Sequence, residues 1–187
     1  MTGVQTCALP ILSDGGYSTN PLNGTPTINA NTVFLLGHGA TDILFKDLAT
    51  NKAITTNGGA IARYTDASWS KPTIYFDGAG DLLSLADSND WHLSNKLFEM
   101  SVWVYLSLGT KATNYGILRQ CNNGESAGWT LTWNTPNLGF WALGGTFELK
   151  ASWSPVADTL YLISVRRNSA TSWTDRKSTR LNSSHRL

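Results

Sequence analysis

Three aromatic side chains occupy positions where a ligand-stacking face could form. Trp103 and Tyr105 alternate with aliphatic residues in the apolar run 97–108, and Trp141 alternates with its apolar neighbours in 138–143. Alternation of this kind places the two sets on opposite faces of a strand. Aromatic rings on an exposed sheet face are flat platforms with polar edges, which suit the faces of sugar rings. We predict Trp103, Tyr105 and Trp141 as ligand-binding residues; the alternative is that they fill a second core layer or face a neighbouring domain.

Two aspartates bracket a glycine-rich turn. Asp77 and Asp81 enclose the sequence Gly-Ala-Gly. Calcium takes hard oxygen ligands from flexible loops, although this spacing is not that of an EF-hand. Aspartates in turns also accept hydrogen bonds from nearby backbone amides. We predict turn capping for both residues, with calcium binding at Asp77 and Asp81 as the alternative. No other cofactor is indicated.

Two patterns that would indicate catalysis are incomplete. Residues 124–128, Gly-Glu-Ser-Ala-Gly, match a nucleophile elbow, but that motif needs a helix after it and later Asp and His residues. A strand pattern follows instead, and the one later histidine is His185. Glycoside hydrolysis needs two carboxylates flanking the bond, whereas the glutamates are scattered singly at Glu99, Glu125 and Glu148. We predict no enzyme activity; an active site in other parts of a longer polypeptide is the alternative.

The elements that would position these residues are short strands joined by turns. A tight hairpin is expected within 71–87, and the longest strand within 97–108. No long segment has helical period, and short strands at even spacing are typical of a β-sandwich. The other expected strands are 32–36, 43–47, 53–56, 60–64, 116–121, 129–133, 138–143, 147–151, 160–166 and one beginning at 172–174, with 129–133 paired to 138–143 across 134–137. The turn within 71–87 needs positive φ values at its Asp-Gly and Gly-Asp pairs. A polar turn or a single helical turn is expected at 87–92.

The two ends of the chain are related to each other at the level of codons. Residues 1–11 and 175–185 can be encoded by one DNA segment and its reverse complement, for example ATC for Ile11 and GAT for Asp175. The deduced DNA resembles the adapter of short-read sequencing libraries. We therefore expect 1–11 and 175–187 to be adapter-derived and outside the fold, with 12–30 a linker or the tail of an upstream domain.

Composition limits the classes of partner. The 14 Lys and Arg include four in residues 175–187, and the 13 Asp and Glu include one there, so the rest of the chain carries 10 basic and 12 acidic side chains. No basic footprint for nucleic acid remains. No window approaches the roughly 20 apolar residues of a membrane helix. With Cys7 in the terminal segment, Cys121 has no partner for a disulfide. We expect no nucleic-acid binding and no membrane insertion.

Several segments together resemble a known family. They are 32–36, 75–85 (Tyr-Phe-Asp-Gly-Ala-Gly-Asp-Leu-Leu-Ser-Leu), 98–104 (Phe-Glu-Met-Ser-Val-Trp-Val), 128–131 (Gly-Trp-Thr-Leu) and 160–166. In this order they resemble the laminin-G-like, concanavalin-A-type jelly-roll domains of phage tail and bacterial surface proteins. The resemblance covers about 31–174.

The resemblance implies an all-β, antiparallel β-sandwich (jelly roll) that is incomplete at its C-terminal strands. It also implies a non-catalytic carbohydrate-binding or adhesion module of a larger phage tail or bacterial surface protein, located outside the cell, on its surface or on a virion. Many relatives bind calcium, and hydrolase relatives carry a Glu-x-Asp-x-x-Glu run that is absent here. A structural spacer of a tail fibre is the first alternative, and part of a glycoside hydrolase the second. The expected partners are a glycan or cell-surface ligand and other domains of the same polypeptide.

The interpretation of the ends can be tested on the gene. Long-read sequencing of the uninterrupted locus should show a reading frame that continues past Thr174 into a Val-Asp-Gly-type strand, with tail-fibre or surface-protein neighbours. A locus that encodes residues 175–187 and then stops would contradict the adapter interpretation, and partners would then have to be reconsidered from that basic tail.

Overall fold

Antiparallel β-strands make up most of the part of the chain that the structure describes. The computed structural model describes residues 4–6, 11–13, 32–36, 45–63, 73–93, 96–106, 114–121, 128–143, 148–167 and 173–179. The strands, in chain order, are β1 Val4–Thr6, β2 Ile11–Ser13, β3 Thr32–Leu35, β4 Ile54–Asn57, β5 Ile61–Arg63, β6 Thr73–Phe76, β7 Leu82–Leu85, β8 Phe98–Leu106, β9 Asn114–Cys121, β10 Gly128–Asn134, β11 Asn137–Leu143, β12 Glu148–Ser152, β13 Thr159–Arg167 and β14 Trp173–Thr179.

Among the described residues, helical structure is restricted to one short segment. A single-turn 3₁₀ helix, Asn89–Trp91, lies between β7 and β8, where a polar turn was expected. The part of the chain that the structure describes contains no α-helix. It also contains no helix long and apolar enough to cross a membrane.

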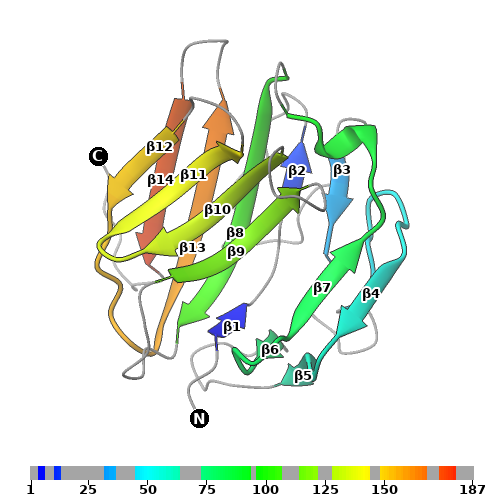
Figure 1. Cartoon of the computed structure of the whole chain (residues 1–187), viewed down its shortest axis with the longest axis horizontal. Helices are drawn as coiled ribbons and strands as arrows, with labels where there is room; N and C mark the ends of the chain where they lie inside the picture. Colours follow the sequence, from blue (N-terminus) through cyan, green and yellow to red (C-terminus); the bar gives the residue numbers. More distant parts are fainter. Residues whose placement is uncertain are drawn as a thin grey trace.

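The strands form three sheets (Figure 1). An eight-stranded sheet has the order β14-β13-β8-β1-β6-β5, and β2 pairs with both β8 and β3. Four consecutive strands form the sheet β12-β11-β10-β9, and β4 pairs with β7. Every described strand pairing is antiparallel. The all-β, antiparallel fold class is therefore confirmed, while the jelly-roll connectivity stays a prediction.

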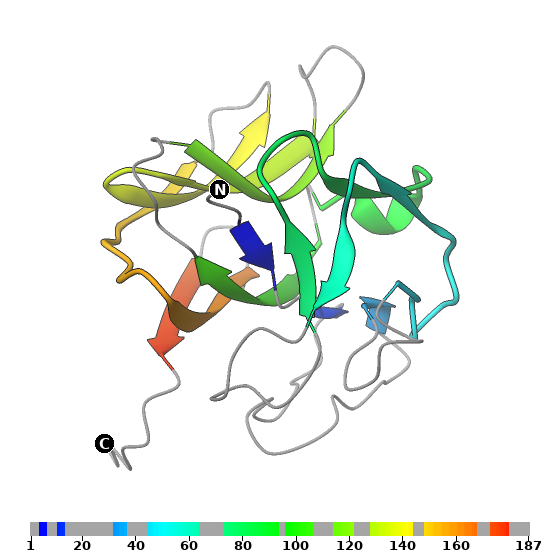
Figure 2. The ribbon, with the colours of Figure 1, turned by 90° about the horizontal axis from the view of Figure 1, so that it is seen from below.

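The four-stranded sheet and the β13–β8 part of the eight-stranded sheet lie in separate layers (Figure 2). Their facing side chains belong to one apolar cluster. The ring centroids of Phe98 on β8 and Phe140 on β11 lie 5.7 Å apart. From β8 the cluster takes the alternate residues Phe98, Met100, Val102 and Val104, as the sequence pattern predicts. Burial of these aliphatic and aromatic side chains is the main source of stability for the paired layers.

The opposite face of β8 is also covered. Trp103 is 0% exposed and packs with Leu35 of β3 and Leu160 of β13, while Tyr105 is half-buried against the same cluster. The prediction that Trp103 lies on an exposed face is therefore wrong, and the second-core-layer alternative is correct for it. The physical reason is that the segment that begins at Phe45 passes over this face, with Leu48 and Ala49 against the cluster.

Asp47 holds this covering segment in place. Its side chain is 3% exposed. One carboxylate oxygen, Oδ1, accepts hydrogen bonds from the amides of Leu35 and Ala49, both at 3.0 Å. The other, Oδ2, accepts from the Thr50 hydroxyl at 2.6 Å and the Lys52 amide at 3.0 Å. Residues 45–47 thus form a turn and one isolated bridge, and not the predicted strand, because an aspartate side chain competes for the local backbone donors.

Lys52 connects the same segment to the 3₁₀ helix. Its ammonium group donates to the carbonyl of Val33 at 2.8 Å and pairs with Asp90 at 2.9 Å. The ammonium nitrogen also lies 5.3 Å from the centre of the Trp91 ring, a cation–π distance. The hydrogen bond from Lys52 keeps the pKa of Asp90 below its ordinary value despite partial desolvation. β3, the turn and the helix are therefore joined by one polar network.

The expected hairpin within 71–87 is a corner between sheets. Strands β6 and β7 exist, and Gly78 and Gly80 between them have φ values of 78° and 94°, as predicted. They do not pair with each other, however: β6 pairs with β5 and β1, and β7 pairs with β4. The hairpin prediction is wrong because local alternation identifies strands and not their partners.

The terminal segments contribute strands to the eight-stranded sheet. β1 pairs with β6 and β8, β2 pairs with β3 and β8, and β14 pairs with β13. We expected 1–11 and 175–187 to lie outside the fold, and the structure differs at 4–6, at Ile11 and at 175–179. Unpaired strand edges are templates that any extended segment can complete, whatever its origin. The adapter origin of the ends stays a prediction.

The Asp47 network makes a prediction about stability and pH. Burial raises the pKa of Asp47, but hydrogen bonds from the Thr50 hydroxyl and from the amides of Leu35, Lys52 and Ala49 outweigh it, so the net pKa is lowered. A carboxyl group with a lowered pKa in the folded state stabilises the protein above its unfolded pKa, near 4, and loses that contribution as the pH falls.

Asp47→Asn should therefore lower the free energy of unfolding by about 2–3 kcal/mol at pH 7. Its difference from the wild type should shrink below about pH 4. Urea unfolding at several pH values would measure this. Asp158→Asn, at an exposed turn residue, is the control and should change little. A difference between Asp47→Asn and wild type that does not vary with pH would contradict the assignment.

Candidate ligand-binding face

The outer face of the four-stranded sheet carries polar side chains around one tryptophan. Along β10, Trp129, Leu131 and Trp133 are buried. The residues between them, Thr130 and Thr132, are half-buried and point to the other face. This alternation follows from the period of two residues in a strand.

The register of the four strands places these outward residues in rows. Thr130 pairs with Trp141 of β11 and with Arg119 of β9. In the next row, Thr132 pairs with Gly139 of β11 and with Gly116 of β9. On β12, Glu148 pairs with Trp141, and Lys150 pairs with Gly139. The face is therefore a polar surface with one large aromatic side chain and two glycines.

The indole ring of Trp141 is fixed in position. Its Nε1–H donates to the hydroxyl oxygen of Thr132 at 3.0 Å. The ring lies over Gly139, because a Cβ atom added to that glycine would overlap three atoms of the indole. Glycine thus leaves room for the Nε1 edge of the indole against the sheet, and the bond to Thr132 fixes that edge. The Trp141 side chain remains half-exposed.

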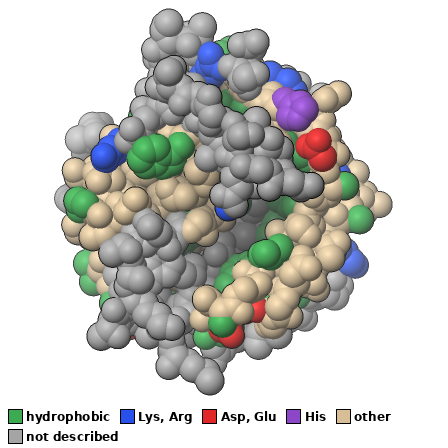
Figure 3. Space-filling model, viewed as in Figure 1, with side chains coloured by type: hydrophobic (Ala, Val, Ile, Leu, Met, Phe, Trp, Pro, Cys, Tyr) green, Lys and Arg blue, Asp and Glu red, His purple; other side chains and the backbone are tan. Residues whose placement is uncertain are grey.

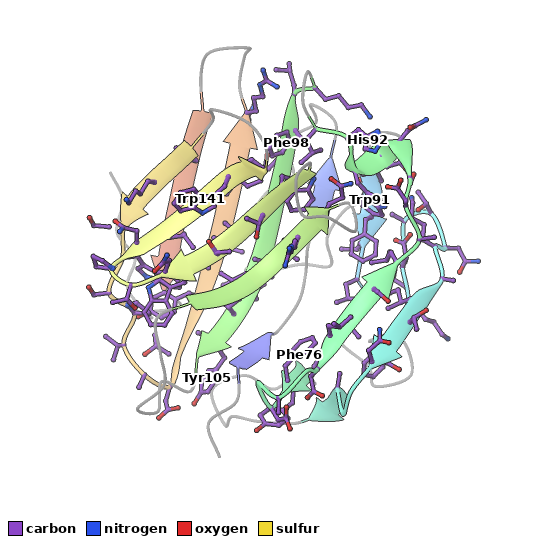
Figure 4. The ribbon with its side chains drawn as sticks, in the orientation of Figure 1. Phe76, Trp91, His92, Phe98, Tyr105 and Trp141 are labelled. Atoms are coloured by element: carbon purple, nitrogen blue, oxygen red, sulfur yellow. The ribbon has the colours of Figure 1, made fainter. Side chains whose placement is uncertain are left out.

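The figures show the setting of this ring. Trp141 lies on β11, on the side of the four-stranded sheet that faces the viewer (Figure 4). In the same orientation, Figure 3 shows a hydrophobic patch at this place, with a Lys or Arg side chain beside it. The ring is thus an apolar platform within a polar surface.

Gly116 leaves an open place beside this platform. It is exposed, and a Cβ atom added there would meet nothing within 4 Å. Its pairing with Thr132 follows from a bulge: Leu131 pairs with Leu118 and Thr132 with Gly116, so that Ile117 is the extra residue. Thr132 therefore lies between the Trp141 ring and the bare backbone of Gly116.

The structure separates the three predicted aromatic residues. Trp141 lies on the outer face of the four-stranded sheet, whereas Trp103 and Tyr105 lie on the far side of β8, beyond the central cluster. These residues cannot form one site. Only Trp141 combines a fixed ring with exposure and polar neighbours, and Trp103, fully buried, has no surface to offer a ligand.

Asp77 and Asp81 cap the corner between the sheets. Asp81 accepts from the Asp77 amide at 2.8 Å and from the Gly59 amide, so that it joins the β6–β7 connection to the β4–β5 turn. Asp77 accepts from the Ala79 amide at 2.7 Å. The hydrogen bonds from Asp77 and Gly59 lower the pKa of Asp81. Turn capping is confirmed for both.

Metal binding by these carboxylates remains an untested alternative. No group of three metal-binding side chains occurs among the residues that the structure describes. The nucleophile-elbow match at 124–128 lies outside the described residues except for Gly128, which opens β10. Of the three glutamates, Glu125 and the side chain of Glu148 also lie outside them.

The sequence contained part of the signal for this face. Strands at 129–133 and 138–143 pairing across 134–137 were expected, and that register alone brings Thr132 opposite Gly139. The roles of Thr132, Gly139 and Gly116 were nevertheless not predicted. The aromatic pattern identifies Trp141, but it does not mark the small residues that lie beneath and beside its ring. The position of Gly116 depends on the bulge at Ile117, which no residue pattern marked.

Comparison with family models, with curated proteins and with solved structures found no match. The geometry of the outer face is therefore the basis of the functional argument.

The position of the indole can be tested by substitution beneath it. Gly139→Ala should displace the ring and break its bond to Thr132, because the new methyl group would occupy the space of the indole. The Trp141 indole N–H signal, identified by its loss in Trp141→Phe, should then shift in a ¹⁵N–¹H spectrum. Gly116→Ala is the matched control and should leave the signal in place. An unmoved signal in Gly139→Ala would show that the ring does not rest on Gly139.

Proposed function

We propose that this chain is a non-catalytic carbohydrate-binding or adhesion module of a larger phage tail or bacterial surface protein, acting outside the cell or on a virion. The outer face of the four-stranded sheet is the proposed binding surface, with Trp141 at its centre. The observation that carries the proposal is the partly exposed indole, held over Gly139 by the bond to Thr132. A preorganised ring loses little conformational freedom when a ligand stacks on it.

The chemistry of the surroundings supports a sugar over an apolar ligand. The faces of pyranose rings are apolar and their edges carry hydroxyl groups. Thr130 and Thr132 on β10 offer hydroxyl groups at the level of the platform. Arg119 and Lys150 are exposed on the strands to either side and add long polar side chains. An apolar ligand would remove these polar side chains from water without forming hydrogen bonds to them.

The expected affinity of one such platform is low. Covering one face of an indole removes about 100 Å² of apolar surface, which contributes about 2.5 kcal/mol. A free energy of about 4 kcal/mol corresponds to a dissociation constant near 1 mM. Binding through this face would therefore need several copies of the module or a ligand with repeated units. A polysaccharide is such a ligand.

A structural spacer of a tail fibre is the second candidate. The burial of Trp103 and the half-burial of Tyr105 favour it, because a spacer needs aromatic residues only as core. The two candidates differ in what they require of Trp141, which a spacer could lose without loss of function.

The test uses the whole chain, biotinylated and multimerised on streptavidin, on an array of immobilised polysaccharides. The wild type should bind at least one of them, and Trp141→Ala should lose at least about tenfold of that binding, because the stacking surface is gone. Val156→Ala, at a side chain 66% exposed, is the surface control and should bind as the wild type does.

Thermal unfolding of each variant would confirm that the fold is retained. Binding that survives in Trp141→Ala would exclude this face as the binding site. A wild type that binds no polysaccharide would favour the spacer.

A further inference from the structure

We infer that the platform is one of two sugar subsites separated by one sugar ring, and that the second lies over Gly116. This inference rests on the proposed function. The ligand it points to is an internal segment of an extended, β-1,4-linked polysaccharide that lies across the strands.

The first step is the position of the open place. Gly116, Thr132 and Gly139 are cross-strand neighbours in one row. Adjacent strands lie about 4.8 Å apart, so Gly116 is about 10 Å from the glycine under the indole. That is about the length of two linked pyranose rings. A chain with one ring stacked on Trp141 would bring its next ring over Thr132 and the following ring over Gly116.

The second step is the shape of the floor. Gly116 has no side chain, and nothing occupies the space that one would take. A side chain that stands up from the sheet at this position would block the sugar ring above it. Glycine leaves that space open. Gly116 also has no positive φ that would require glycine for backbone reasons. The lack of a side chain at Gly116 therefore shapes the surface, and the backbone conformation does not require it.

The third step is the polar group between the two places. The Thr132 hydroxyl oxygen accepts from the Trp141 indole, which leaves the hydroxyl proton to be donated. Within the described part of the chain, no acceptor for that proton is recorded. It is positioned to donate to an oxygen of the sugar ring that lies between the two subsites.

The open ends of the row determine which part of a polysaccharide fits. The two ends of the row are Lys150 on β12 and Gly116 on β9. Both residues are exposed, so neither end of the row is closed. A site that is open at both ends accepts the interior of a chain. A flat floor selects an extended ribbon, such as a β-1,4-linked glucan, mannan or xylan, over a coiled or flexible chain.

The experiment is affinity gel electrophoresis of the full chain in gels containing hydroxyethylcellulose, galactomannan, xylan or dextran. The wild type should be retarded by at least one of the three β-1,4-linked polymers and not by the α-1,6-linked dextran. Gly116→Val should weaken that retardation by about tenfold, because its branched side chain stands on the floor of the second subsite.

Two controls separate obstruction from misfolding. Gly116→Ala adds one methyl group and should remain within about threefold of the wild type. Asn134→Val adds the same branched side chain at an exposed position of β10 in the adjacent row, and should also bind nearly as the wild type does. Valine suits a strand, and space is open at Gly116, so all three variants should unfold at similar temperatures.

The outcomes distinguish this inference from the proposed function. Retardation that is lost in Trp141→Ala but unchanged in Gly116→Val would overturn the second subsite and leave the proposed function standing. Retardation by dextran alone would overturn the extended-ribbon ligand in the same way. A wild type that no gel retards would overturn both.

Discussion

β8 has apolar side chains on both faces, and the rest of the structure serves to keep both from water. The four-stranded sheet covers the face of Met100, Val102 and Val104. The turn that contains Asp47 helps to cover the face of Trp103. A buried carboxylate is costly unless its oxygens accept hydrogen bonds, and here four backbone amides and one hydroxyl supply them. The turn therefore depends on the Asp47 carboxylate, and the buried carboxylate depends on the hydrogen bonds that the turn donates.

On the outer face, two glycines have opposite effects on the surface. Gly139 lies beneath the indole of Trp141 and leaves the space that the ring occupies. At Gly116 the space above the backbone is open. Thr132 stands between them and fixes the ring by a hydrogen bond. The proposed site is therefore made as much by the absence of side chains as by the presence of one aromatic residue.

Sequence reasoning was reliable for elements defined by neighbours in the chain. Strand β8, the pairing of β10 with β11 and the turn capping by Asp77 and Asp81 all depend on local period or local hydrogen bonds. Sequence reasoning failed where the pairing or packing partners are far apart in the chain. Alternation could not reveal that β6 and β7 belong to different sheets, or that a turn around Asp47 buries Trp103. Of the candidate site, Trp141 was identified, while its two glycines and Thr132 emerge only from the register.

The topology also bears on the order of folding. The four-stranded sheet is a meander of strands consecutive in the chain, β9 to β12, so its contacts close short loops. The eight-stranded sheet instead joins residues far apart, such as Glu99 with Arg166 and Val4 with Leu106. Long-range pairings of this kind slow folding. The meander that carries Trp141 has the lower loop-closure cost, which favours its early assembly, with the closure of β8 against β13 as the slow step.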